Sequence, residues 1–535
     1  MAQTIGDGRG PPPGTSRARP GPPERAGTVA SVRADQSAPS AGPPRPPAPE
    51  PIAAAGPAAT SRTGPGTPGP AVGRLWGGWL LSRALLVVGV LIGQTFGAQQ
   101  SVLGDLRIYA DWAHDLGHGG GLPAGDDRWQ YPPGAAVALV LPELAHTLSA
   151  VPYRVAFLVL TLLADAAVTA ALARRDRGAA LFWVVGITAL GPVALARFDL
   201  LPAAAAVAAV LAVSRARFGR AGFHLGVGTL LKVWPLLLLV AVPAPAGSPS
   251  RWPAWLRAGA ARLVGGLLGA VGLLAAVGAL TGWWRDVLGF LGAQQARGLQ
   301  VEAVAATPFV VAHMLGGPAP DYSYGSLQFG GPAARAVATA CTLLEAVAVV
   351  AAAVWWWTRA RQPAGAGAAR TGEGTVTSGV ACVVPPGDAA ADPRAMAATL
   401  AGRALALVVV VVVTARVLSP QYLVWILALV AAGLAVAPPG ATGDAAGTAP
   451  APGSGGRPWG PRARLPVALL ACVVLTQIIY PWRYNDVIQG RIVLSLLLVG
   501  RNLGLLTVCW WAVRAAAGPP AARLRPRRRR RARRP

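Results

Sequence analysis

Lysine is almost absent from this chain of 535 residues, in which Lys232 is the only lysine among 48 basic side chains. Acidic residues are also scarce, and the formal net charge is +26. The arginines gather in both tails and in particular loops rather than on a basic face with interleaved aromatic residues. This distribution argues against nucleic-acid binding and favours a membrane protein whose basic loops set its orientation.

Cysteine is equally sparse, with four residues in the chain. Three lie in apolar segments and one in a loop predicted to be cytoplasmic, namely Cys341, Cys472, Cys509 and Cys382. Their spacing contains neither a disulfide framework nor a cysteine metal site. The cysteines therefore carry no information about the chemistry of the protein.

Apolar residues are abundant, since 53% of the chain is hydrophobic. Segments of about 20 nearly uncharged residues recur, and each is long enough to cross the apolar part of a bilayer. The sequence predicts an all-α, polytopic integral membrane protein with about 11–13 membrane helices, some of them re-entrant or juxtamembrane.

Three regions are expected along the chain. Residues 1–72 contain mostly Pro, Gly, Ala, Ser and Arg, which predicts a disordered cytoplasmic tail. Residues 73–514 form the membrane domain, and residues 515–535 form a second cytoplasmic tail with nine arginines between Arg523 and Arg534. We interpret that second tail as a topology anchor at anionic lipid headgroups.

The positive-inside rule assigns each loop to a side of the plasma membrane. The basic loops are expected in the cytoplasm, at residues 173–178, 214–220, 251–262, 359–403 and 457–464. The opposite face then carries residues 104–134, 283–332, 416–422 and 480–490. Both termini are predicted to be cytoplasmic.

Two apolar segments fit this topology only if they do not cross the membrane. Residues 134–150 are predicted to form a juxtamembrane or re-entrant helix that Pro142 and Glu143 interrupt. Residues 225–242 contain Lys232, and we expect two half-helices that meet near Lys232 and Pro235. Broken backbone at membrane depth is tolerated only where it is buried in protein or lines a cavity.

The first outer loop is acidic in an otherwise basic protein. Its five aspartates are Asp105, Asp111, Asp115, Asp126 and Asp127. Acids are tolerated on the outer side, which is a sufficient explanation for the last four. Asp105 lies closest to the preceding membrane helix, where a carboxylate could meet a lipid-borne substrate. His114 and His118 are one helical turn apart, but the glycines that follow break the helix, so no metal site is expected there.

Seven segments occur in an order that resembles actinobacterial members of glycosyltransferase family 87, which are polyprenyl-phosphate-mannose-dependent α-1,2-mannosyltransferases of the C-type superfamily. They are GDLRIYADWA, RWQYPPGAAVALVLPELA, ARFDLLPAAAAVAAVLA, AGFHLGVGTLLKVWPLLLL, RGLQVEAVAATP, VLSPQYLVWILALVA and YPWRYNDV with GRNLGLL. The resemblance covers roughly residues 74–514 and omits both tails. The chain also resembles the catalytic subunits of GPI mannosyltransferases, in which a comparable Tyr-x-Pro segment follows the acidic first loop.

This resemblance implies a mechanism and a set of partners. A first-loop aspartate acts as general base in the family, and Asp105 matches its position. The donor would be a polyprenyl-phosphate sugar, the acceptor a lipid or glycan of the cell envelope, and the site extracytoplasmic and in contact with membrane lipids. A departing lipid phosphate needs no protonation, so one base and one cation suffice. No Asp-x-Asp pair lies near Asp105, which favours a mechanism without metal or cofactor.

Lys232 has three possible roles. Its ammonium could hold the donor phosphate, pair internally with a carboxylate such as Asp199, or extend to water along its own stem. Arg197 and Asp199 are expected at an outer helix start in the same cavity. Further candidate substrate-binding residues are Tyr131, Arg297, Glu302, Gln421 and Tyr422, although Arg297 and Glu302 could instead form an exposed loop ion pair.

A transporter is the competing function, for instance a flippase of a lipid-linked sugar or a carrier of another envelope lipid. Such carriers often consist of two related halves with charges in several helices. This chain has no visible repeat, and its polar residues gather in loops on one side. A structural scaffold would require neither Lys232 nor Asp105.

Overall fold

The computed structural model describes residues 70–92, 98, 102–123, 129–243, 254–283, 285, 287–361, 392–437 and 461–517. Within these residues the protein is all-α apart from one small sheet, which confirms the predicted fold class. The two predicted tails and Cys382 lie outside the described residues, except for the tail residues that belong to the first and last helices.

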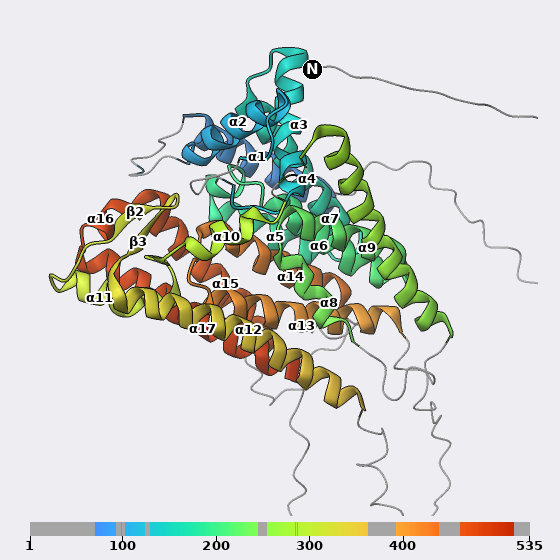
Figure 1. The fold of residues 1–535 in the computed structure, drawn as a ribbon. Coiled ribbons are helices and arrows are strands. Elements are labelled where there is room, and N and C mark those ends of the chain that lie inside the picture. The colour runs from blue at the N-terminus through green and yellow to red at the C-terminus, as the bar shows by residue number, and fades with distance from the viewer. Residues whose placement is uncertain are drawn as a thin grey trace, which may run out of the picture. The chain divides into compact units, whose positions relative to one another are not determined.

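The helices follow one another along the chain (Figure 1). They are α1 (Pro70–Ile92), α2 (Gly104–Gly117), α3 (Gly134–Ser149), α4 (Tyr153–Ala173), α5 (Arg177–Leu190), α6 (Leu200–Val213), α7 (Phe218–Leu231), α8 (Leu237–Ala241), α9 (Ala254–Thr281), α10 (Gly289–Ala296), α11 (Thr307–Met314), α12 (Gly331–Arg361), α13 (Pro393–Thr414), α14 (Leu423–Val436), α15 (Pro461–Gln477), α16 (Tyr484–Ile488) and α17 (Ile492–Ala517). Short helical turns are η1 (Pro192–Ala194), η2 (Trp234–Leu236), η4 (Val304–Ala306), η6 (Pro420–Tyr422) and η7 (Ile478–Trp482).

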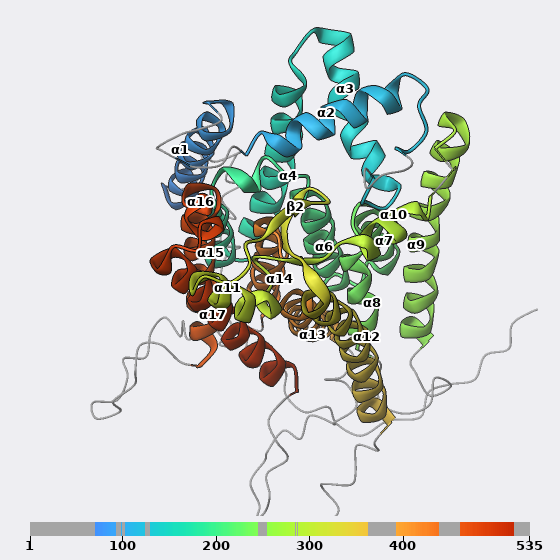
Figure 2. The same cartoon turned by 60° about the vertical axis from the view of Figure 1, so that its left-hand side comes forward.

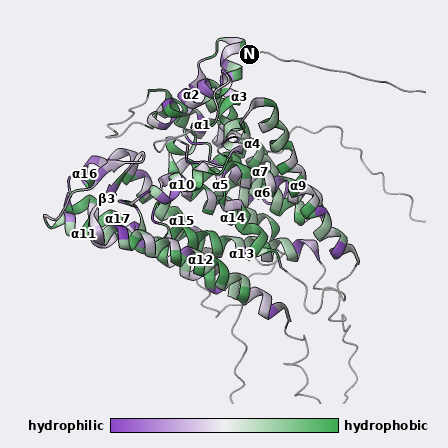
Figure 3. Ribbon diagram, in the orientation of Figure 1, coloured by the Kyte–Doolittle hydropathy of each residue, from purple (hydrophilic) through white to green (hydrophobic). Residues whose placement is uncertain are grey.

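Seven of the described helices are long and apolar enough to cross a membrane. They are α4, α13 and α17 over their full length, α1, α9 and α12 over most of their length, and α15 from Arg464 onward together with η7. Five further apolar helices are shorter, at 10–17 residues. Figure 3 shows hydrophobic residues along the long helices, as expected for surfaces in contact with lipid.

The segment around Lys232 is broken as the sequence predicted. Helix α7 ends at Leu231, Lys232 has an extended backbone, and the short turn η2 leads into α8. Pro235 stands at the start of η2, where its missing N–H costs no helical hydrogen bond. This break places a lysine at a helix end instead of inside a continuous helix.

The predicted interruption of residues 134–150 is wrong. Pro142 and Glu143 lie inside one continuous helix, α3, which ends only at Ser149 with Ala150 in the left-handed conformation. Pro142 removes one backbone hydrogen bond, but α3 packs against both α2 and α4. Tertiary packing therefore holds the helix through the proline.

Helices α7 and α9 form the most extensive contact among the described helices and lie side by side in Figures 1 and 2. Glycines permit their close approach. A Cβ added at Gly266 would collide with the carbonyl oxygen of Gly219, and one at Gly222 would collide with that of Leu263. Small residues of this kind are typical where membrane helices touch through their backbones.

A buried ion pair joins α1 to α4. Arg83 Nε lies 2.8 Å from Asp165 Oδ2, and both side chains are almost completely inaccessible. The indole nitrogens of Trp79 and Trp183 also donate to this carboxylate, at 2.6 and 2.8 Å. Arg83 further donates to the carbonyl oxygen of Val184. The network provides hydrogen-bond partners for a buried charged pair between two candidate membrane-spanning helices. The sequence did not predict this pair.

The small sheet belongs to a predicted outer loop. Its strands β1 (Leu299–Gln300), β3 (Ser326–Phe329) and β2 (Asp321–Ser323) are antiparallel in that order. Leu299 pairs with Phe329, and Tyr322 pairs with Leu327. Because the backbone of Gln300 also donates to the carbonyl oxygen of Arg416, the sheet is tied to the loop after α13.

Candidate active site

A cavity of about 1450 Å³ lies where four loops meet. Its walls come from α2 and the loop after it, the break after α7, the small sheet, α12, and the segments around residues 416–422 and 480–484. All four loops that the charge pattern assigned to one side of the membrane contribute residues. Their convergence on one cavity supports that common assignment and identifies the candidate site.

Asp105 stands in the first turn of α2 and faces this cavity. It forms an ion pair with Arg197 Nε, and about a third of its side chain remains exposed. Arg197 is buried and also hydrogen-bonds to the hydroxyl of Tyr480. Burial opposes the charged form of this guanidinium, but Asp105 and the neighbouring hydroxyls of Tyr480, Tyr109 and Tyr131 together outweigh it and raise the pKa of Arg197. The arrangement fixes one carboxylate at the cavity wall.

Lys232 is paired internally. Its Nζ lies 2.7 Å from Oδ1 of Asp199, which is completely buried and also accepts a 2.7 Å hydrogen bond from Trp425 Nε1. The ammonium does not extend to water. It nevertheless lines the cavity, so the pair stands at the cavity wall with Asp199 behind Lys232.

Four aromatic rings surround the Lys232 ammonium. The ring centroids of Tyr131, Phe198, Tyr422 and Trp425 lie 5.2–5.5 Å from Nζ. The negative faces of aromatic rings attract a cation, and the attraction grows when water is excluded. Together with Asp199, the rings stabilise a charge that would otherwise be costly to bury.

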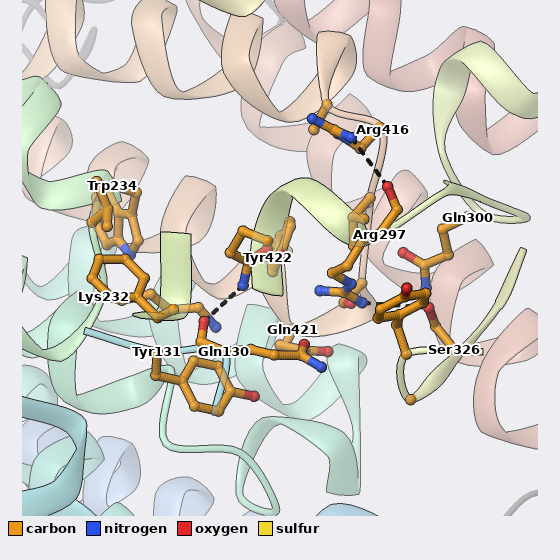
Figure 4. Close-up of a pocket in the computed structure, with 18 of the residues that line it drawn as sticks. Gln130, Tyr131, Lys232, Trp234, Arg297, Gln300, Ser326, Arg416, Gln421 and Tyr422 are labelled. Atoms are coloured by element: carbon orange, nitrogen blue, oxygen red, sulfur yellow. Dashed lines mark hydrogen bonds between the residues drawn. The ribbon is translucent and has the colours of Figure 1, made fainter. Parts of the chain in front are cut away.

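Arg297 is a buried guanidinium whose partner is not a carboxylate. Within the described part of the chain it forms no ion pair, and its side chain donates a hydrogen bond from Nη2 to Ser326 Oγ at 3.4 Å. Its Nε has no hydrogen-bond partner in the same residues. Figure 4 shows Arg297 with Ser326 on one side of Gln421 and Lys232 with Tyr131 on the other. A buried cation without a counter-ion favours an anionic ligand.

Glu302 does not pair with Arg297. It is buried and faces Arg501 of α17, with 3.5 Å between its Oε2 and Arg501 Nη2. Burial raises the pKa of the Glu302 carboxyl to about 7, an effect that Arg501 and the hydroxyl of Tyr484 only partly offset. The alternative role for Arg297 and Glu302, an exposed loop ion pair, is therefore wrong, and both residues line the cavity.

The structure brings the predicted site residues together. The cavity is lined by Asp105, Tyr131, Arg197, Lys232, Arg297, Glu302, Gln421 and Tyr422, and Asp199 contacts Lys232 from behind. Asp111 and Asp115 also face the cavity. Asp126 and Asp127 lie outside the described residues.

Sequence reasoning missed several residues of the site. Tyr480, Tyr484, Arg416, Gln300 and Trp425 line the cavity, and their side chains complete the surroundings of the predicted residues. Most of them lie in loops already assigned to the outer side. Their position in those loops was the sequence feature that could have identified them, because no spacing rule links them to Asp105.

Residues 129–386 match the family model of glycosyltransferase family 87, which supports membership of the chain in that family. The match supports a membrane glycosyltransferase, and the family implies a sugar donor and an acceptor. The match begins just before Tyr131 and includes the break at Lys232 and the loop with Arg297 and Glu302. Comparisons with curated proteins and with solved structures gave no match.

Proposed function

We propose that this protein transfers a hexose, in particular mannose, from a polyprenyl-phosphate donor to a lipoglycan of the cell envelope on the extracytoplasmic face. The observation that carries the proposal is the cavity itself. It combines a partly exposed carboxylate, Asp105, with a buried guanidinium, Arg297, that has no carboxylate partner among the residues that the structure describes. A base and an anion-binding cation are the two groups that transfer from a lipid phosphate requires.

Asp105 acts as the general base. Its carboxylate accepts the proton of the acceptor hydroxyl while that oxygen bonds to the anomeric carbon of the sugar. The bond between that carbon and the phosphate oxygen breaks, and its electron pair leaves with the phosphate. Attack from the opposite face inverts the anomeric centre. Arg197 orients Asp105 through their ion pair.

Arg297 binds the donor phosphate. We favour it over Lys232 for this role because the charge of Lys232 already has Asp199 as its partner. A guanidinium matches phosphate geometry through paired N–H donors. Lys232 then contributes through its aromatic cage, which holds Tyr131 and Tyr422 at the cavity wall.

The cavity also has an apolar side that suits a lipid-borne donor. Val350 of α12 lines it and is 61% exposed on the molecular surface, and Leu236 near the break lines it and is 41% exposed. These residues connect the cavity with surface that contacts lipid in a membrane. A polyprenyl chain can therefore remain in the bilayer while its phosphate enters the site.

Replacement of the base tests the proposal. Asp105→Asn keeps the side-chain shape and removes the proton acceptor, so we expect transfer of radiolabelled mannose from polyprenyl-phosphate-mannose to fall about 100-fold or more. The membrane-inserted amount of the variant should equal that of the wild type. Asp111→Asn is the matched control, since Asp111 lines the same cavity from the same helix and should retain transfer. Transfer by Asp105→Asn within a few-fold of wild type would remove Asp105 from the mechanism.

A further inference from the structure

Three metal-ligating side chains meet outside the cavity, between α2 and α3. His114 and His118 come from the C-terminal end of α2, and Glu143 comes from the middle of α3. One ligand atom from each lies within 4.8 Å of the others. None of the three lines the candidate active site.

The separation of two of these groups suits a shared metal ion better than a hydrogen bond. His114 Nδ1 and Glu143 Oε1 are 3.3 Å apart, whereas N–H···O hydrogen bonds are typically about 2.9–3.0 Å long. Zinc bonds His nitrogen and carboxylate oxygen at about 2.0–2.2 Å, so two of its ligand atoms at a tetrahedral angle lie roughly 3.3–3.5 Å apart. The observed spacing matches that value.

His118 is prepared for coordination by its own helix. Its Nδ1 donates to the carbonyl oxygen of His114 at 2.8 Å. This hydrogen bond places the proton on Nδ1 and leaves the lone pair of Nε2 free to bind a metal. A metal-binding histidine usually donates its second ring nitrogen to a carbonyl or carboxylate in this manner. The two rings already face each other, with their centroids 4.1 Å apart.

The burial of Glu143 and the exposure of the histidines also favour metal binding. The Glu143 side chain is 7% exposed, and among the described residues its one ion-pair partner is His114, whose side chain is 63% exposed. A buried carboxylate is stabilised by a cation, and the exposed histidines leave a path by which an ion can enter from solvent.

We propose that His114, His118 and Glu143 bind one divalent transition-metal ion, best satisfied by Zn²⁺, which fastens the end of α2 to α3. Asp105 lies in the first turn of the same helix, about 14 Å from His114 and about 20 Å from His118 at a rise of about 1.5 Å per residue. The ion therefore acts on structure and takes no part in sugar transfer. Two histidines and one carboxylate leave a fourth position for water.

Zinc binding by the full-length protein in detergent tests the proposal. The protein is prepared without a polyhistidine tag, stripped with chelator, and titrated with ZnCl₂, and bound zinc is measured by equilibrium dialysis. We expect one zinc per chain, and affinity at least about 10- to 100-fold weaker in His118→Ala and Glu143→Gln, which is the cost seen even for outer-shell changes. Titration with CoCl₂ should give visible d–d absorption in the wild type but not in His118→Ala or Glu143→Gln.

His146→Ala is the matched control. His146 lies at the end of α3, is exposed, and is not part of the cluster, so its loss should leave zinc binding unchanged. Size-exclusion profiles establish that each variant is folded, and His118 is exposed enough that its replacement should not disturb packing. Equal zinc affinity in the wild type and His118→Ala would overturn the proposal, as would weak binding that His146→Ala reduces equally.

Discussion

At the scale of single residues, the pair of Lys232 and Asp199 is a buried ion pair whose charges are costly to remove from water. Asp199 is completely buried and Lys232 is 9% exposed, and Asp199 Oδ2 has no hydrogen-bond partner among the described residues. The pair joins the start of α6 to the end of α7, while Trp425 adds α14 through the same carboxylate. A substitution at Lys232 therefore alters a contact that α6, α7 and α14 share.

Lys232→Met should lower the folded yield of the protein. The substitution keeps the apolar stem but leaves the carboxylate of Asp199 buried and uncompensated, which costs about 3–5 kcal/mol. The double variant Lys232→Met with Asp199→Asn should recover most of the loss. The monodisperse fraction after detergent extraction and the melting temperature measure both effects.

Lys232→Arg provides the control for charge alone, because it keeps the cation with different geometry. We expect its yield to lie between those of the wild type and Lys232→Met. A normal yield of Lys232→Met, with no gain from the second substitution, would show that the pair does not stabilise the fold.

The sequence predicted this residue as unusual but could not choose its partner. Its isolation in an apolar segment identified Lys232, and Asp199 was named as one possible partner. Only the packing of α6 against α7 brings the two within 2.7 Å. Arg297 and Glu302 illustrate the opposite case, since their nearness in sequence suggested a pair that the fold separates.

At the scale of elements, the contact between α7 and α9 determines where Lys232 lies. Helix α7 ends one residue before Lys232, and it approaches α9 through glycines. A displacement of α7 would therefore move the lysine and the turn η2 at the cavity wall.

Gly266→Ala should separate these two helices. A Cβ at this position collides with backbone atoms of Gly219 and Phe223, which cannot rotate away as a side chain would. Overpacking of this kind typically costs about 1–3 kcal/mol. We expect a lower melting temperature in detergent and reduced transfer activity.

Gly265→Ala is the neighbouring control in the same helix. Its added Cβ meets no atom within 4 Å, and alanine favours helix by about 1 kcal/mol over glycine in soluble hosts. The control should melt at or above the wild-type temperature. If both variants melted alike, close approach through Gly266 would not stabilise the helix pair.

Local sequence patterns predicted helix boundaries well where a residue type restricts the backbone. They predicted boundaries less well where contacts with neighbouring helices determine whether a helix continues. The break at Lys232 and Pro235 follows from a polar residue and a proline in an apolar run. The continuity of α3 through Pro142 does not, because contacts with α2 and α4 offset the lost hydrogen bond. The helix that carries Asp105 extends to Gly117, which places His114 and His118 on an ordered turn that the following glycines had seemed to exclude.

At the scale of the whole molecule, the charge pattern separates two sets of loops. The predicted outer loops, which are poor in arginine, meet at the cavity. Arg175 of one basic loop donates to Ser214 of another, and two arginines of a third basic loop donate to helix ends, Arg394 to the carbonyl oxygen of Ala437 and Arg359 to that of Ala517. Which set faces the cytoplasm follows from the positive-inside rule and stays a prediction.

Single-cysteine labelling in intact cells measures this orientation. In a background without the four native cysteines, Gly121→Cys should react with a membrane-impermeant thiol reagent, and Arg177→Cys should react only after permeabilisation. Both positions are exposed, and a Cβ at Gly121 meets no neighbouring atom. Labelling of Arg177→Cys from outside, with protection of Gly121→Cys, would reverse the proposed topology.

The ion pair between Arg83 and Asp165 has a consequence for how the protein is made. The two residues are 82 positions apart, so at about 5–20 residues per second the guanidinium of α1 is synthesised roughly 4–16 s before its carboxylate. During that interval a charge near the middle of α1 has no partner, and its residence in lipid costs about 3 kcal/mol on insertion scales. We therefore expect α1 to wait beside the insertion machinery or near the headgroups until α4 emerges, which makes its final placement a late event in biogenesis although it precedes the other described helices in the chain.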